Sequence, residues 1–236
     1  MINTFLLKKE NILSENSSSI IEFLKWVGIL SMTLDHIGIL IYKDYDFFRM
    51  IGRLAFPIFG FVLIYNFMYH TKSKVKYIKR LVLFSVLFET IHFFVLKNNY
   101  AGLNIFFIYS MALYFLYLFE LVQDSKERSK EKILFVSVIF ALLLYASRYT
   151  EYGISGLLLT ISFYFTLKYK HLTIVTLFLL VFLNAPAVKY ILSTLAVVPL
   201  GYLTAKCSVT IPRSRYFFYL YYPVHLLIIW MYAYHW

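Results

Sequence analysis

Long apolar runs separated by short polar segments fill the chain from residue 20 onward. There are nine of them, at about residues 20–42, 54–70, 78–96, 103–121, 132–147, 153–168, 171–187, 189–205 and 216–235. A hydrocarbon core about 30 Å thick needs a helix of roughly 17–25 residues. The fifth and sixth runs are short, so they must be buried among other helices or lie where the bilayer thins. The pattern predicts an all-α, polytopic helical membrane protein with about nine transmembrane helices.

Two boundaries qualify this prediction. Residues 1–19 lack the long apolar core and the small-residue cleavage site of a signal peptide. We therefore expect a polar N-terminal leader over residues 1–19, followed by a single transmembrane domain over residues 20–236. The break at Asn184-Ala185-Pro186 is only a turn, so a count of eight spans stays open as an alternative.

Composition agrees with a membrane protein. Of the 236 residues, 61% are hydrophobic and 15% are charged, whereas a soluble domain has about 45–50% apolar and roughly 25% charged residues. The chain has one cysteine, Cys207, so an internal disulfide and a cysteine-type metal cluster are excluded.

The net charge of +11 indicates orientation once the basic residues are sorted by side. With nine spans, 17 of the 23 lysines and arginines fall on one side and 6 on the other. The basic side faces the cytoplasm by the positive-inside bias. We therefore expect a multi-pass protein of the cell membrane with its N-terminus in the cytoplasm, and no nucleic-acid partner. Eight spans would sort the charge less well.

An acid and a histidine lie deep in the first run, at Asp35 and His36. They are roughly 22 Å from its inner end at about 1.5 Å per residue. Ionisable groups in a bilayer cost at least about 2.5–3.5 kcal/mol each, and they usually face a bundle interior and have a function. Consecutive residues point about 100° apart on a helix, so the two need partners from other helices. We expect Arg53, one turn after Arg49, to neutralise Asp35, and His36 to act as base or nucleophile.

Further ionisable residues occur in the middle and outer parts of other runs. Glu89 and His92 are three residues apart on one helix face, and Arg148 and Glu151 repeat this spacing in a loop. Each pair could bind substrate or form a structural contact, and for the second pair a loop salt bridge is the favoured interpretation. Di-iron proteins use Glu-x-x-His twice on facing helices, and the chain has one copy, so we expect no metal site. His225 lies near the middle of the last run.

A basic stretch covers residues 70–80. It marks the cytoplasmic side, but it could also hold the phosphates of a cytosolic cofactor, with Arg80 as a bidentate contact and Lys76 or Lys79 as point charges. The chain has no glycine-rich phosphate loop or dinucleotide fingerprint. Nucleotide chemistry is therefore not expected.

Several of these residues stand in blocks that resemble one family. The blocks read Leu34-Asp35-His36-Ile37-Gly38, Gly52-Arg53-Leu54-Ala55-Phe56-Pro57 and Tyr221-Tyr222-Pro223-Val224-His225-Leu226. They resemble the TraX family, named for the pilin acetylation protein of conjugative plasmids, over about residues 24–230. More remotely, the chain is similar to membrane acyltransferases that modify surface sugars. Glu151 stands where the resemblance leads us to expect an aspartate, which keeps the charge and lengthens its reach.

The resemblance implies an acetyltransferase that moves an acetyl group from cytosolic acetyl-CoA to an amine or hydroxyl. Its acceptor would be a protein, peptide or glycan at the membrane or cell surface, its surroundings would be membrane lipid, and it would need no metal. The implied catalytic residues are His36, Asp35, Arg53 and His225, the implied donor-binding residues are Lys76, Lys79 and Arg80, and the implied substrate-binding residues are Glu89, His92, Arg148 and Glu151.

Two other classes of function stay open. Buried acids and histidines also form the proton relays of transporters, so a proton-coupled transporter is the main alternative. Transporters commonly contain internal repeats with paired broken helices, and the chain shows no repeat. In a non-catalytic assembly factor the buried charges would serve only helix packing.

Overall fold

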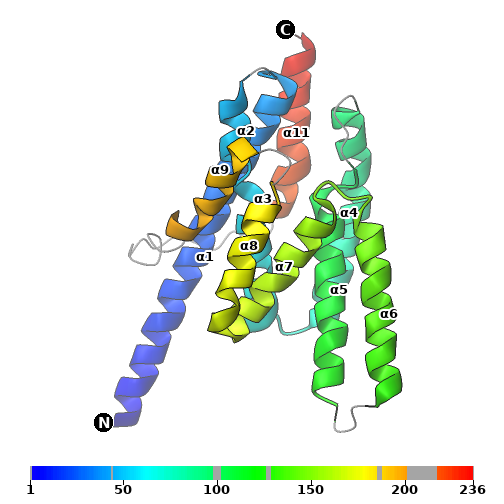
Figure 1. The fold of residues 1–236 in the computed structure, drawn as a ribbon. Helices are drawn as coiled ribbons and strands as arrows, with labels where there is room; N and C mark the ends of the chain where they lie inside the picture. Colours follow the sequence, from blue (N-terminus) through cyan, green and yellow to red (C-terminus); the bar gives the residue numbers. More distant parts are fainter. Residues whose placement is uncertain are drawn as a thin grey trace.

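The protein is a bundle of helices (Figure 1). The computed structural model describes residues 2–43, 45–97, 102–125, 129–184, 188–200 and 217–235. Its helices are α1 (Ile2–Leu40), α2 (Asp46–Gly52), α3 (Ala55–Tyr69), α4 (Lys74–Leu96), α5 (Ile105–Gln123), α6 (Lys130–Ser147), α7 (Gly153–Lys168), α8 (Thr173–Phe182), α9 (Ile191–Leu195) and α11 (Phe217–His235), with 3-10 turns η1 (Lys170–Leu172) and η2 (Val188–Tyr190). The described part has no strand, so the predicted all-α class is confirmed there.

Polar residues between the apolar runs explain where several helices begin. The Ser73 hydroxyl accepts a hydrogen bond from the Lys76 amide at the start of α4, and the Asn104 side chain accepts one from the Phe106 amide at the start of α5. Side-chain oxygens at this position satisfy amides that have no partner inside the helix. The predicted runs therefore begin close to the observed starts of α4 and α5.

The predicted number of spans is wrong. Four described segments are long and apolar enough to cross a membrane: Ser19–Leu40, Asp46–Tyr69, Ile105–Gln123 and Phe217–Tyr234. Three other apolar helices, Gly153–Lys168, Lys170–Phe182 and Ile191–Leu200, are shorter, and the N-terminal part of α4 is rich in lysine and arginine. The structure therefore supports a multi-span membrane protein with four such helices among the described residues, and not nine.

Two other sequence-based expectations concern the ends of runs. α1 continues without a break from Ile2 to Leu40, so residues of the predicted polar leader belong to the same helix as the first span. Residues 185–187 and 201–216 lie outside the described part, and so do most of the break at Asn184, the end of the eighth run and Cys207.

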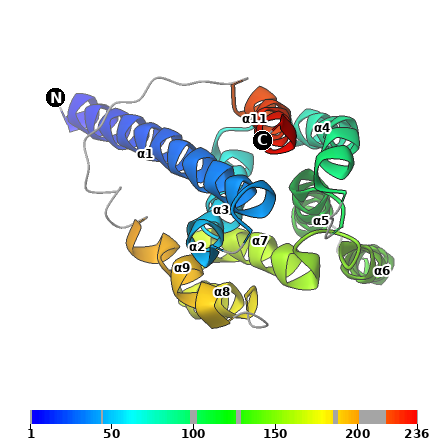
Figure 2. The same cartoon turned by 90° about the horizontal axis from the view of Figure 1, so that it is seen from above.

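The helices pack around α3, which lies near the middle of the bundle with α1, α5 and α7 beside it (Figure 2). The main apolar core joins α3, α5 and α7 through side chains such as Phe56, Phe67, Ile108, Leu113 and Leu157. α11 packs between α1 and α4. We call the end where α1 turns into α2 the α1–α2 end, and the end where α3 turns into α4 the α3–α4 end.

Candidate functional site

Two buried histidines from distant parts of the chain form a hydrogen bond. His36 Nδ1 on α1 lies 2.9 Å from His225 Nε2 on α11, and His225 Nδ1 lies 2.7 Å from the Tyr221 carbonyl oxygen. A carbonyl can only accept, so His225 Nδ1 carries the hydrogen. In neutral rings, His225 Nε2 then accepts the hydrogen of His36 Nδ1. This relay leaves His36 Nε2 with a free electron pair, as a base or nucleophile requires.

Asp35 pairs with Arg49. Its Oδ2 atom accepts a hydrogen bond from Arg49 Nη1 at 2.8 Å. Gly52 allows this close approach of α2 to α1, because a Cβ atom there would collide with the Asp35 carboxylate. The predicted partner, Arg53, is wrong as the direct countercharge. Arg53 follows directly after α2, which ends at Gly52, and its guanidinium lies 5.0 Å from the centre of the Tyr190 ring.

Two buried polar atoms at this end have no hydrogen-bond partner within the described residues: Asp35 Oδ1 and Arg53 Nε. Such groups are costly to leave unpaired and need an explanation. Asp35 lines a small cavity of about 20 Å³ together with Met32, His36, Gly52, Ala55, Phe56, Phe59, Ile105, Glu151, Tyr152 and Tyr222. An unsatisfied acceptor beside a cavity indicates a site for a polar ligand.

Glu89 and His92 lie on one face of α4, as their spacing predicts, with His92 Nδ1 3.6 Å from Glu89 Oε1. Glu89 Oε2 accepts two hydrogen bonds from Asn104, from the backbone N and from Nδ2, both at 2.8 Å. Asn104 Nδ2 also donates to the Ser85 carbonyl oxygen. Neither Glu89 nor His92 lines a described cavity, so Glu89 holds the loop before α5 in place.

This loop in turn holds the turn between α6 and α7. Leu103 N donates to the Tyr149 carbonyl oxygen at 2.8 Å, and Glu151 N donates to the Leu103 carbonyl oxygen at 3.1 Å. Gly102 has φ +130°, and a Cβ there would lie 2.7 Å from the Tyr149 oxygen, so the contact needs glycine. Glu89 therefore helps to position the Glu151 backbone, through the hydrogen bonds that hold these two loops together.

The structure separates the two members of the predicted loop pair. Glu151 faces the small cavity. Arg148 is exposed, its guanidinium lies 5.8 Å from the centre of the Tyr145 ring, and no ion pair with Glu151 forms in the described structure. Burial and the nearby Asp35 charge raise the pKa of Glu151 from 4.5 to about 7, against the opposing effect of Arg53 and Arg49.

Glu151 makes stability depend on pH. Between pH 4.5 and about 7 the folded protein keeps a proton that the unfolded chain has released, so stability falls as pH rises through this window. We expect Glu151→Gln to remove this fall. The difference in melting temperature between variant and wild type, measured in detergent, should be larger at pH 8 than at pH 5. Asp124→Asn, at an exposed carboxylate in the α5–α6 loop, is the control. An equal difference at both pH values would contradict the raised pKa.

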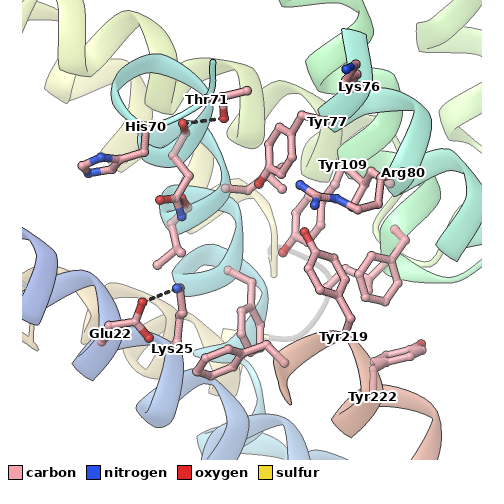
Figure 3. Close-up of a pocket in the computed structure, with 18 of the residues that line it drawn as sticks. Glu22, Lys25, His70, Thr71, Lys76, Tyr77, Arg80, Tyr109, Tyr219 and Tyr222 are labelled. Atoms are coloured by element: carbon pink, nitrogen blue, oxygen red, sulfur yellow. Dashed lines mark hydrogen bonds and ion pairs between the residues drawn. The ribbon is translucent and has the colours of Figure 1, made fainter. Parts of the chain in front are cut away.

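A much larger cavity of about 710 Å³ opens toward the α3–α4 end (Figure 3). α1 supplies Glu22 and Lys25 on one side, and α4 supplies Lys76 and Arg80 on the other. Lys25 Nζ is 2.6 Å from Glu22 Oε1. The turn between α3 and α4 adds further polar residues, which are His70, Thr71, Lys72 and Ser73. At its inner end the cavity adjoins the small one, because both share the lining residues Met32, Phe59, Ile105 and Tyr222.

The structure places two of the three predicted donor-binding residues at one cavity. Lys76 and Arg80, one turn apart, both line the large cavity, whereas Lys79 does not. Sequence reasoning missed Lys25 and Lys72, whose only signal was their place on the basic side. It also missed Arg49 as a site residue, although its position one turn before Arg53 was visible. Among the residues that the structure describes, no group of three or more histidines, cysteines or acids could hold a metal ion.

These features define a polytopic helical membrane protein with a polar site buried between its helices and a basic cavity leading to it. The chain belongs to the TraX family, since the family model described as TraX protein matches residues 20–233.

Two relatives match parts of the chain to different extents. A probable fimbrial assembly protein of Dichelobacter nodosus, FimC, is 27% identical over 229 residues, which cover 87% of this chain and 92% of that protein. An uncharacterized protein of Rickettsia prowazekii is 30% identical over 108 residues, which cover 46% of this chain and 41% of that protein. The match thus spans less than half of the Rickettsia protein. No solved structure matches the chain.

Proposed function

We propose that the protein is an integral membrane acetyltransferase that moves an acetyl group from acetyl-CoA to an amine or hydroxyl of a membrane or cell-surface acceptor. The observation that carries this proposal is the large basic cavity whose inner end adjoins the small cavity that His36 lines. An anionic donor with a long arm needs both features: cations at the entrance and a reacting group in the interior. The fimbrial name of the Dichelobacter relative supports a surface protein as acceptor.

Lys72, Lys76 and Arg80 are the donor-binding residues in this proposal. All three line the large cavity, and the Arg80 guanidinium stacks near the Tyr77 and Tyr219 rings, 5.5 and 5.7 Å from their centres. Arginine binds phosphate with two parallel hydrogen bonds, and lysine acts as a point charge. This end of the bundle would face the cytoplasm, in line with the positive-inside bias.

His36 is the proposed catalytic base. Its Nε2 atom takes the proton of the acceptor N–H or O–H as that atom bonds to the thioester carbonyl carbon. When the carbon–sulfur bond breaks, the proton passes to the leaving thiolate, so free CoA thiol and acetylated acceptor result. A short-lived acetyl group on His36 itself is the variant of this scheme. Arg53 lines neither cavity, so its proposed role is to balance the charges of Asp35 and Glu151 beside the reacting centre.

The test is incubation of the purified protein in liposomes with acetyl-labelled acetyl-CoA and a cell-envelope extract as acceptor. Release of CoA thiol together with label on an acceptor is the expected result. Movement of a solute or protons across the liposome membrane without thioester cleavage would contradict the proposal and favour the transporter class. If neither thioester cleavage nor flux is observed, helix packing is left as the only role of the buried charges. This result would also overturn the proposal.

The donor-binding residues give a second prediction. We expect Lys76→Ala and Arg80→Ala each to raise the KM for acetyl-CoA by roughly tenfold, the effect of losing about 1.4 kcal/mol of a charge-assisted contact. Lys79→Ala is the matched control, because Lys79 lies on the same helix but outside the cavity. Initial rates at varied acetyl-CoA concentration measure the effect. A KM for Lys79→Ala raised as much as in the other two variants would contradict the assignment.

A further inference from the structure

Four apolar side chains separate the large cavity from the small one. Met32 comes from α1, Phe59 from α3, Ile105 from α5 and Tyr222 from α11, and these four are the residues that line both cavities. We call them the constriction. Any group that enters from the α3–α4 end and reaches His36 has to pass between them.

Two sides of the constriction are held by their neighbours. The Phe59 ring packs on the backbone of α1 at Gly28, where a Cβ atom would lie 2.9 Å from its Cζ atom. The Tyr222 ring lies edge-on to the Phe106 ring, 5.0 Å between centres at 89°. Met32 is the adaptable member, since its unbranched side chain has several rotatable bonds. The opening is therefore narrow and can widen mainly on the α1 side.

The space beyond the constriction is small. Its volume of about 20 Å³ is close to the roughly 10–15 Å³ that one water molecule needs. Apart from the constriction, its walls include the Phe56 ring and the closely packed Gly52, whose neighbour is the Asp35 carboxylate. This is room for about one methyl-sized group, so the methyl of an acetyl group would fill the space and the added methylene of a propionyl group would overlap its walls.

We propose that the constriction, with the small cavity behind it, sets the upper limit on acyl chain length and selects acetyl over longer acyl groups. This inference rests on the proposed function, which it deepens by naming the residues that choose the donor. Replacing a constriction residue with a smaller one should then relax the choice without changing His36, Asp35 or the cationic entrance.

The experiment compares acetyl-, propionyl- and butyryl-CoA as donors, with release of CoA thiol as the readout. We expect the wild type to use propionyl-CoA at least roughly tenfold more slowly than acetyl-CoA, the discrimination that one methylene gives in a tight pocket. Met32→Ala should reduce this ratio by roughly the same factor. Phe59→Leu also widens the constriction, by a smaller amount, and serves as a second variant in case Met32→Ala folds poorly. Met111→Ala is the matched control, because Met111 packs in the core and lines neither cavity.

The outcomes are distinguishable. A relaxed preference in Met32→Ala and Phe59→Leu, with the wild-type preference kept in Met111→Ala, is the expected result. Equal wild-type rates with all three donors would overturn the chain-length limit and leave the proposed function intact. An unchanged preference in both enlarged variants would place the limit elsewhere and also overturn this inference. No thiol release from any donor would overturn the proposed function and this inference together.

Discussion

His36→Ala is expected to lower the rate of acetyl transfer by about 10³- to 10⁴-fold, at the upper end of the effect of removing a general base. The geometry behind this expectation is the relay from the Tyr221 carbonyl oxygen through His225 to His36, with separations of 2.7 and 2.9 Å. The relay fixes which nitrogen of His36 carries the electron pair. Removing the imidazole removes the group that accepts the proton.

The measurement is the initial rate of label transfer from acetyl-CoA at saturating donor, with melting temperature recorded to show that the variant is folded. His171→Ala serves as control, since His171 is exposed in η1 and lines neither cavity. His225→Ala should lower the rate less than His36→Ala does. The His36 base remains in this variant, but its ring hydrogen is no longer held on Nδ1 and can move to Nε2. Near-normal activity of folded His36→Ala would remove His36 from the mechanism.

Asp35→Asn is expected to give the largest loss of stability, about 2–3 kcal/mol. This lies between the roughly 0–1 kcal/mol of an exposed pair and the 3–5 kcal/mol lost on breaking a buried one, because the Asp35 side chain is 11% exposed and that of Arg49 is 23% exposed. The substitution leaves Arg49 and the nearby Arg53 as two positive charges without a neutralising carboxylate. It should also reduce activity, since α2 would no longer be held against α1 beside the small cavity.

A matched control exists at the same end of the molecule. Asp46 forms a 2.6 Å ion pair with Lys189 in which both side chains are 53% exposed, so Asp46→Asn should cost much less stability than Asp35→Asn. Denaturation in mixed micelles would compare the two variants. The double variant Asp35→Asn, Arg49→Gln should recover part of the stability, because only the Arg53 charge then lacks the Asp35 carboxylate. Equal losses in the two single variants would mean that the Asp35 pair is no stronger than a surface pair.

The helix positions could be predicted well because each apolar run ends at polar or turn-forming residues. α7, observed at Gly153–Lys168, has the predicted bounds. The number of crossings could not be predicted, because an apolar run of 10–17 residues is compatible with a span, a buried helix or a surface helix. Length and composition of the described helices support four.

The site was predictable as a set of residues but not as a set of contacts. Asp35, His36 and His225 were recognisable because ionisable side chains are rare within apolar runs. The His36–His225 hydrogen bond joins residues 189 positions apart, and the sequence does not show which faces of two distant helices meet. Arg53 was a wrong partner for Asp35 because the pairing depends on α2 ending at Gly52. Lys79 was included among donor-binding residues because a charge count does not distinguish one helix face from another.

The joining of α1 to α11 through His36 and His225 has a consequence for biosynthesis. Asp35 and its partner Arg49 are only 14 residues apart, so both members of that contact are synthesised long before α11. His36 gains its partner His225 only after α11 has been made and has packed between α1 and α4. A nascent or truncated chain that lacks α11 therefore has a paired aspartate but an unsupported histidine. The proposed catalytic pair is therefore complete only once α11 has been made, whereas the α1, α3 and α4 walls of the large cavity come from earlier parts of the chain.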